Sequence, residues 1–417
     1  MTGTVEERTV NQQAAVSDGP LSGIRVVDFG WVLAGPYATM LLSYLGAEVI
    51  KVESRRRVDE QRIAHRAGLS EEVDASSNFF EVNLGKESVT INIASPQGAE
   101  LARSLVATAD VAIENMRPGV MNRLGLGYAD LVKVKPDLIM LSISGWGGAG
   151  PMRDYTAYAP CFASYSGMAH LTGYADGEPN TGTSSNDARA GSAAAFAIMT
   201  ALMIRERTGQ GQYIDFAASF ALNSLVGDSV VAYEMTGASP ARDGNRDTRM
   251  APHGVYRCQG ADRWISIAVA DDEEWGRLRA AMGDPSWAGT ARYATAAGRR
   301  RDQDLLDRQI EQWTSSRDVS ELVELLQDHR VAAVPSMDAR DLFTSPHLLE
   351  RGAISEIDHP VLGRRQAISP PWVLSESPAR IRRTAPLLGE NNDHVLKGIL
   401  GLTDAEIAPL EDVKVIY

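Results

Sequence analysis

The chain has 417 residues, more than one hydrophobic core usually accommodates, so we expect two structural units. Hydrophobic residues make up 44% and charged residues 23%, a composition typical of a globular protein that excludes a disordered or fibrous one. The formal net charge of -13 argues against nucleic acid as a partner, because phosphate groups are bound by surfaces rich in Lys and Arg.

The cysteine content and the N-terminal segment bear on location. Cys161 and Cys258 are too few for a disulfide framework, which favours a reducing compartment. Residues 1–20 are polar, include acidic side chains and lack the apolar run of a signal peptide, so we expect a flexible tail there. The longest apolar stretches fall short of the roughly 20 residues that a membrane span needs. We therefore predict a cytoplasmic protein with no membrane partner.

Strand-like and helix-like segments alternate through the first third of the chain. A β-branched run at 24–29 predicts a strand, a loop with Gly and Pro follows, and apolar residues at 37–45 suit a buried helix. Further strands are expected at 48–52, 89–93, 111–115 and 138–143, with a helix at 98–107. This alternation is typical of a mostly parallel sheet with helices on both faces. Ligands of such sheets bind at the carboxyl ends of the strands, so a site is expected in the loops there.

A polar stretch at 239–250 separates this part of the chain from a region with a different pattern. Before it, 188–205 predicts a long helix rich in Ala, and the run QYIDFA from Gln212 is either a strand or the start of another helix. After it come a strand at 264–269 and helices at 271–282, 302–313 and 319–329. We therefore predict the first part of a large domain at 21–240 and a smaller domain at 245–335.

Three common site motifs are missing from the sequence in the context that their function requires. The Gly-rich segment at 145–151 has no GxGxxG between a strand and a helix with an acidic residue about 20 positions further on, so a dinucleotide site is not predicted. The seven His residues show no HxxxH or HExxH spacing, so no metal site is predicted. The GxSxG signature of serine hydrolases is also missing.

Six segments, taken in order, are similar to segments of one enzyme family. They are LSGIRVVDFGWVLAGPYATMLLSYLGAEVIKVE from Leu21, NLGKESVTINIASPQG from Asn83, ADVAIENMRPGVMNRLGLGY from Ala109, SGWGGAGP from Ser144, RERTGQGQYIDFA from Arg205 and PLLGEN from Pro386. In these segments the chain resembles the class III CoA-transferase family, which includes formyl-CoA transferase, carnitine CoA-transferase and alpha-methylacyl-CoA racemase. Together they span almost the whole chain from Leu21 to Asn391.

The resemblance implies an α/β fold, with a Rossmann-like large domain built on a mostly parallel sheet and a smaller α/β domain. Two subunits of that family thread through one another, so an interlocked homodimer is implied, with a heteromer containing a homologous subunit as an alternative. Residues 336–417 would return to complete the large domain.

The resemblance also implies an activity, that of an acyl-CoA:carboxylate CoA-transferase. The partners would be an acyl-CoA and a small carboxylic acid, with coenzyme A thioesters as substrates and no permanently bound cofactor. Our hypothesis for the donor is succinyl-CoA. Because Leu33 and Ala159 replace polar residues of some transferases in the family, we expect an acyl pocket more apolar than one for formate or oxalate, suited to a dicarboxylic or aromatic acid.

Asp187 is the catalytic candidate, because SSNDARAG from Ser184 matches the position of the family's catalytic aspartate. A carboxylate can attack the donor thioester and later carry coenzyme A as an aspartyl-CoA thioester. The structural alternative is a helix N-cap, since Asp often precedes an apolar helix.

The resemblance places coenzyme A contacts at nine further positions: Leu33, Ala34, Arg55, Ile91, Asn115, Met116, Arg123, Tyr158 and Ala159. Arg123 would neutralise a phosphate of the nucleotide. Arg55 lies in the basic run 55–57, which could equally be a solvated turn, and Ser54 stands where the family has an arginine. Leu33 stands where formyl-CoA transferase has a glutamine, and core packing is its alternative role.

Two other functions stay open. A racemase of the same fold needs a second acid or base opposite the aspartate, and the related racemases have His followed by Asp at the positions of Tyr158 and Ala159. The chain lacks that pair, so transfer is preferred. A non-catalytic subunit of a heteromeric transferase is the second alternative, and the presence of Asp187 argues against it.

Overall fold

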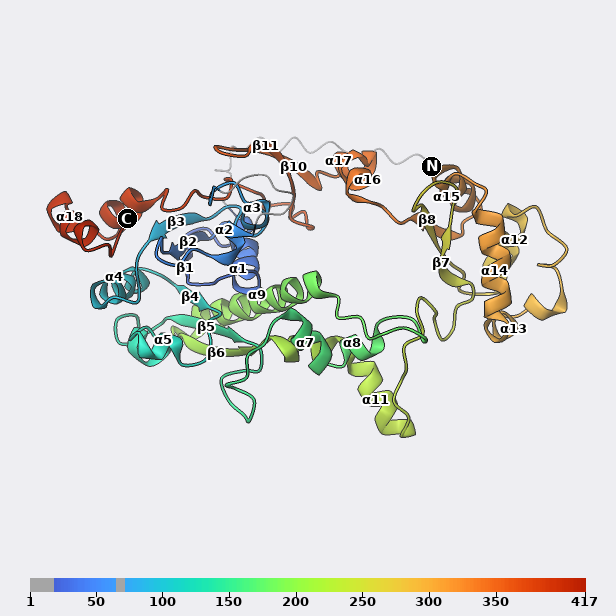
Figure 1. Ribbon diagram of the computed structural model, residues 1–417, viewed down its shortest axis with the longest axis horizontal. Coiled ribbons are helices and arrows are strands. Elements are labelled where there is room, and N and C mark those ends of the chain that lie inside the picture. Colours follow the sequence, from blue (N-terminus) through green and yellow to red (C-terminus); the bar gives the residue numbers. More distant parts are fainter. Residues whose placement is uncertain (1–18, 65–71) are drawn as a thin grey trace, which may run out of the picture. The chain divides into compact units, whose positions relative to one another are not determined.

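The computed structural model describes residues 19–64 and 72–417 and divides them into two compact units (Figure 1). The first unit contains the described residues up to Ala169, together with Thr181–Glu234 and Leu349–Tyr417. The second contains His170–Asn180 and Met235–Leu348. The tail predicted at 1–20 lies, up to residue 18, outside the described residues.

A six-stranded sheet forms the centre of the first unit. Its strands are β1 (Arg25–Asp28), β2 (Glu48–Glu53), β3 (Glu87–Thr90), β4 (Val111–Glu114), β5 (Ile139–Ser144) and β6 (Gln212–Ala217). Every pairing is parallel and the order is β3-β2-β1-β4-β5-β6, which confirms the predicted parallel α/β architecture. The order reverses between β1 and β4, where loops diverge and open sheets of this type bind ligands.

Apolar residues cover both faces of this sheet. Val26 and Val49 point to one face, where α1 (Ala34–Tyr44) and α9 (Thr183–Thr208) pack. Val27 and Ile50 point to the other, where α4 (Pro96–Ala107) packs. This alternation follows from the two-residue period of a strand. Burial on both faces explains why the strands read as nearly continuous apolar runs.

Shorter helices connect these elements. In the first unit they are α2 (Glu60–Ile63), α3 (Ser77–Val82), α5 (Val120–Arg123), α6 (Tyr128–Leu131), α7 (Ala159–Tyr165) and α10 (Ala218–Asn223). Two further helices, α8 (Met168–Leu171) and α11 (Gly227–Thr236), contain the boundaries between the units. The QYIDFA run, left open between strand and helix, forms strand β6.

The composition of the long helix α9 fits either a membrane-spanning helix or a core helix. Its stretch Ser185–Thr208 is long and apolar enough to cross a membrane, a test that core helices also pass. Its residues Ala190, Ala194 and Ile198 are buried in the core shared with α1, so we assign it as a core helix of the first unit. The absence of a membrane partner remains a prediction.

The C-terminal segment completes the first unit. It contains the antiparallel hairpin β10 (Ile354–His359) and β11 (Gly363–Ile368), a π-helix at His394–Ile399 and α18 (Asp404–Asp412). Asn391 exchanges hydrogen bonds with the backbone of Ser88, and the side chain of Asn392 accepts from the N–H of Thr90. The segment therefore covers the free edge of β3, which would otherwise expose unpaired backbone groups.

The second unit is built on a three-stranded antiparallel sheet. Its strands are β7 (His253–Arg257), β8 (Trp264–Ala268) and β9 (Ala332–Pro335). The helices are α12 (Asp272–Ala281), α13 (Ala296–Arg301), α14 (Gln303–Thr314), α15 (Val319–Asp328), α16 (Ala339–Thr344) and α17 (Pro346–Glu350), of which the last crosses the unit boundary. The core contains Trp275, Leu278, Leu306 and Ile310.

Residues 170–180 belong to this second unit, although sequence analysis placed them in the large domain. The backbone of Gly244 donates to the carbonyl of Gly173, and the Arg242 guanidinium donates to the carbonyls of His170 and Gly177. These partners are far apart in sequence, so no local pattern indicates the contact.

Gly191 sets the distance between α9 and α1. A Cβ atom at this position would lie 2.7 Å from the carbonyl oxygen of Ala34 and 3.2 Å from the amide nitrogen of Ala38. Only glycine allows the two helix backbones to approach so closely. The first turn of α1 and the N-terminal part of α9 are therefore held side by side.

We predict that Gly191→Ala destabilises the protein by about 1 to 3 kcal/mol, because the added methyl group forces the helices apart. Gly276→Ala in α12 is the matched control, since a Cβ there meets nothing within 4 Å. That change should stabilise by about 0.5 to 1 kcal/mol through the helix propensity of alanine. Thermal unfolding midpoints compare the two, and equal stabilisation by both would disprove the close packing at Gly191.

Candidate active site

The loop between β1 and α1 is held by side chains beneath it. The N–H of Gly30 donates to Asp28 Oδ1 at 2.7 Å, and the carbonyl of Gly30 accepts from Lys51 Nζ at 2.5 Å. The Asn115 amide accepts from the N–H of Trp31 and donates to its carbonyl, both at 2.7 Å. Side chains from three neighbouring strands or strand ends thus fix the loop backbone.

Val32, the next residue of this loop, has an unusual backbone conformation. Its φ is +62°, in the left-handed region that a β-branched residue rarely adopts. Such a conformation costs of order 1 to 3 kcal/mol and persists only where the surroundings impose it. Here the N–H of Val32 donates to Asp59 Oδ1 at 3.2 Å. The strained conformation turns the chain into α1.

The acidic and basic groups beneath the loop form a buried network. Asp28 is fully buried and bonds to Lys86 at 2.9 Å and to the Thr39 hydroxyl at 2.7 Å. Burial alone would raise the pKa of Asp28, but Lys86 and Lys51 outweigh it and hold the pKa below its ordinary value. Lys51 in turn pairs with Asp59 at 3.1 Å. Sequence analysis missed this network, although Asp28 and Lys51 are charged residues within apolar strands.

Helix α1 begins directly after this loop. Leu33 occupies its N-cap position without a side-chain hydrogen bond, and Ala34 is the first helical residue. The first N–H groups of a helix have no partner within it and carry partial positive charge. The start of α1 therefore offers backbone donors at the carboxyl edge of the sheet.

Asp187 lies at the same edge. Near the other end of α9, Arg205 pairs with Asp110, which immediately precedes β4, so α9 runs from the carboxyl edge to the amino edge. Asp187 is one turn before Gly191 and on the same side of the helix, because residues four apart share a face. Since Gly191 contacts Ala34, the geometry brings Asp187 close to the start of α1.

The Asp187 carboxylate is half-buried and lacks partners. Burial raises its pKa to about 6. Within residues 19–64 and 72–417, no group donates a hydrogen bond to it. Helix α9 begins at Thr183 with Gly182 at the N-cap, so the alternative that Asp187 caps the helix is wrong. A carboxylate with free oxygens remains available to react.

The residue before Asp187 joins α9 to α7. The side-chain amide of Asn186 donates to the carbonyl of Thr181 at 2.7 Å and to that of Ala159 at 3.3 Å. Ala159 is buried as the first residue of α7, and Tyr158 at the N-cap is 67% exposed. Ala159 thus lies beside the Asp187 turn.

Three other predicted contacts have different surroundings. Arg55 donates to the carbonyls of Tyr417 and Leu388, so its guanidinium fastens the C-terminal segment. The side chain of Ile91 is 1% exposed and packs in the core with α4. Arg123 is exposed to solvent at the end of α5. Asn115, as described above, is engaged with Trp31, so its amide positions the loop.

A cavity of about 330 Å³ lies at the carboxyl ends of β4, β5 and β6. Its wall includes Met116, Glu114 and Ser144. Burial raises the pKa of Glu114 to about 7, and its carboxylate accepts the N–H of Met116 at 2.7 Å. The Ser144 hydroxyl is buried without a partner. Polar groups thus extend from Asn115 into a pocket at the edge of the sheet where a ligand site was expected from the sequence.

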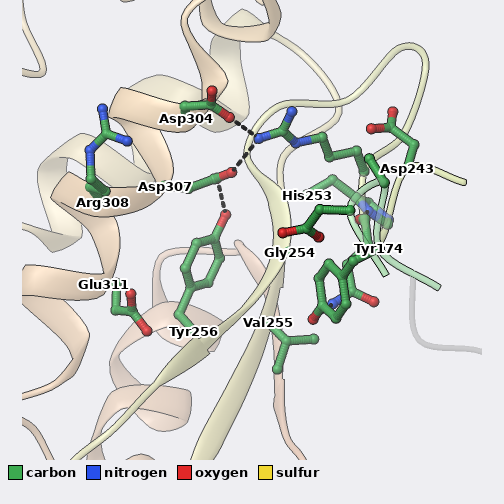
Figure 2. Close-up of a pocket in the computed structure, with 14 residues that line it drawn as sticks. Tyr174, Asp243, His253, Gly254, Val255, Tyr256, Asp304, Asp307, Arg308 and Glu311 are labelled. Carbon is green, nitrogen blue, oxygen red and sulfur yellow. Dashed lines mark hydrogen bonds and ion pairs between the residues drawn. The ribbon is translucent and has the colours of Figure 1, made fainter. Parts of the chain in front are cut away.

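The second unit has a cavity of its own, of about 450 Å³ (Figure 2). Arg246 pairs with Asp304 and Asp307 across it, and the Tyr256 hydroxyl donates to Asp307 at 2.8 Å (Figure 2). These groups satisfy one another, so we assign no reaction to this cavity.

We predict that Asp187→Asn stabilises the protein at neutral pH by about 2 kcal/mol, because it removes a buried charge without partners. Below about pH 4 the carboxyl is neutral in both the folded and unfolded chain, so the variant and wild type should be equally stable. Between about pH 4 and pH 6 only the unfolded chain ionises, and wild type loses stability. Thermal midpoints across this range test the prediction, and a constant difference at all pH values would contradict it.

Comparisons with known proteins identify relatives of the whole chain. The model of CoA-transferase family III matches residues 21–392. The chain is 35% identical to the succinyl-CoA–L-malate CoA-transferase beta subunit of Chloroflexus aurantiacus, covering 95% of this chain and 98% of that protein. It is 33% identical to the succinyl-CoA–D-citramalate CoA-transferase of the same organism, with 95% and 98% covered.

A solved structure shares the fold. The crystal structure of a CAIB/BAIF family protein from Brucella suis aligns with a TM-score of 0.82 and 31% sequence identity, covering 92% of this chain and 99% of that one. The match extends over the large unit, the small unit and the returning C-terminal segment, in agreement with the family model. The chain therefore belongs to CoA-transferase family III.

Proposed function

We propose that the protein moves coenzyme A from an acyl-CoA to a carboxylic acid through a covalent intermediate on Asp187. The observation that carries the proposal is the Asp187 carboxylate, half-buried and without partners beside the start of α1. Membership of the transferase family supports the same reaction class.

The reaction runs as two exchanges at one carboxylate. Asp187 attacks the donor thioester carbonyl, forming a mixed anhydride and releasing coenzyme A thiolate. The thiolate attacks the aspartyl carbonyl and releases the donor acid, leaving an aspartyl-CoA thioester. The acceptor carboxylate then attacks this thioester and expels the thiolate. Attack of the thiolate on the acceptor acyl carbonyl gives the new acyl-CoA and restores Asp187.

The start of α1, at Leu33 and Ala34, supplies electrostatic support in this scheme. Negative charge develops on the carbonyl oxygen in each tetrahedral intermediate, and fixed backbone N–H groups stabilise such a charge. The uncapped first turn of α1, which the strained Val32 directs, provides donors that need little reorganisation.

For the substrates we infer succinyl-CoA as donor and a four- or five-carbon dicarboxylic acid as acceptor. Two relatives carry names of succinyl-CoA transferases acting on malate and citramalate. Racemisation is less well supported, since exposed Tyr158 and apolar Ala159 offer no acid or base pair beside Asp187.

Asp187→Asn tests the mechanism, because asparagine keeps the shape of the side chain but cannot act as an anionic nucleophile. We expect transfer from succinyl-CoA to fall at least about 10³-fold, with Asp412→Asn on the exposed end of α18 as a control that retains full activity. Wild type incubated with succinyl-CoA and no acceptor should form an adduct that hydroxylamine converts to a hydroxamate at residue 187. Full activity of the Asn variant, or labelling at another residue, would refute the proposal.

A homodimer is our inference for the assembly. The stretch from α9 to α11 exposes large apolar side chains: Phe196, Met203, Phe220, Leu225, Val230, Val231 and Tyr233. Where exposed apolar side chains form a large patch, the patch marks an interface. In an interlocked dimer each chain would cover this surface of the other.

We expect sedimentation to show a dimer that persists on dilution, because threaded chains separate only by unfolding. Phe220→Asp should reduce assembly by placing a charge in the interface, whereas Val413→Asp, at a site 62% exposed beside α18, should leave it intact. A folded wild-type monomer at micromolar concentration would contradict the inference.

A further inference from the structure

Three potential metal ligands meet at the amino edge of the large sheet, opposite the edge that holds Asp187. Glu48 is the first residue of β2, Glu87 the first of β3, and His394 the first of the π-helix in the C-terminal segment. His394 Nε2 lies 3.5 Å from Glu48 Oε1 and 3.5 Å from Glu87 Oε2. One donor atom from each of the three lies within 4.8 Å of the others.

Each glutamate uses its other oxygen for an arginine. Arg25 Nε pairs with Glu48 Oε2 at 2.7 Å, and Arg383 pairs with Glu87 Oε1. The remaining oxygens, Glu48 Oε1 and Glu87 Oε2, are the ones that approach His394. The arginines therefore orient both carboxylates and offset part of their charge, as partners outside a coordination sphere do.

Glu87 provides an independent sign that a ligand belongs here. Its side chain is only 7% exposed, and its buried Oε2 atom accepts no hydrogen bond from residues 19–64 or 72–417. A buried carboxylate oxygen without a hydrogen bond is costly and rare in native proteins. Glu48 and His394 are 33% and 50% exposed, so an ion can reach the three donors from solvent.

The spacing also suits a metal ion. Metal bonds of about 2.0 to 2.2 Å at tetrahedral or octahedral angles separate neighbouring ligand atoms by roughly 3.0 to 3.5 Å. The two distances from His394 Nε2 are already 3.5 Å, and the two carboxylate oxygens lie within 4.8 Å of each other, so side-chain rotation can complete the arrangement. An imidazole nitrogen favours a transition metal over Mg²⁺ or Ca²⁺, while carboxylates accept either class.

We propose that Glu48, Glu87 and His394 bind one divalent transition-metal ion, with water at the remaining position. The site has a structural role: it ties the C-terminal segment to the first residues of β2 and β3. Hydrogen bonds of Asn391 and Asn392 to the β3 edge lie within three residues of His394, so a bound ion strengthens an existing attachment. The free energy of binding a metal ion at such a site adds to the free energy of folding.

The test uses the full chain after treatment with a chelator and dialysis, with Zn²⁺ titrated by calorimetry. We expect one saturable site per chain, with an affinity lowered by more than about tenfold in His394→Ala. His347→Ala, at an exposed histidine of α17, is the matched control and should bind as wild type does. Mg²⁺ should not compete, because it does not favour imidazole.

A second measurement separates a lost ligand from a misfolded variant. Co²⁺ bound by wild type should show visible absorption that Zn²⁺ displaces, and Glu48→Gln should weaken it while circular dichroism stays unchanged. Zn²⁺ should raise the thermal midpoint of wild type and leave that of His394→Ala unchanged. Binding that is absent in wild type, or equal in His394→Ala, would overturn the site and leave a histidinium paired with two glutamates. Neither result touches the proposed reaction, since Asp187 lies at the other edge.

Discussion

The position of the loop between β1 and α1 depends on buried charges that lie directly beneath it. Asp28, Lys51 and Asp59 each bond to a backbone group of this loop and also to one another or to Lys86. Removing one charge of a buried pair leaves the other uncompensated, at a cost of about 3 to 5 kcal/mol. The network therefore maintains the strained Val32 and, with it, the direction in which α1 begins. Because Gly191 packs α9 on that first turn, the placement of Asp187 follows from the same charges.

Local sequence patterns predict much of this arrangement because strands and helices have short periods. The β-branched run at 24–29 becomes β1, and the small-residue run after Asp187 becomes α9, since the residues that decide each element are adjacent in sequence. The first residue of α9 is not evident from the sequence pattern. Asp187 has the character of a cap, but the helix begins four residues earlier, after Gly182 in a left-handed conformation.

Contacts between distant residues could not be predicted in this way. Arg55 belongs to a basic run that suggests a phosphate site, but its partners are carbonyls more than 300 positions away. Glu48, Glu87 and His394 come from three separate segments, so no spacing rule for metal ligands detects them. Asn115 matches a coenzyme A contact of the family, yet its amide is occupied by Trp31, an interaction visible only once β1 and β4 are paired.

Two aspartates at the carboxyl edge show how environment separates structural from reactive carboxylates. Asp28 accepts hydrogen bonds from Gly30, Thr39 and Lys86, and its pKa is lowered, so it is ionised but has no oxygen free to attack. Asp187 has a raised pKa because burial is not offset by a partner among the described residues, so its ionised form is poorly stabilised and correspondingly reactive. Forming the anhydride or the thioester removes the negative charge of Asp187. In the proposed mechanism, forming the covalent intermediate therefore removes the unfavourable free energy of burying the Asp187 charge. The unpaired carboxylate lowers the stability of the folded protein, and the same lack of stabilisation makes it a stronger nucleophile.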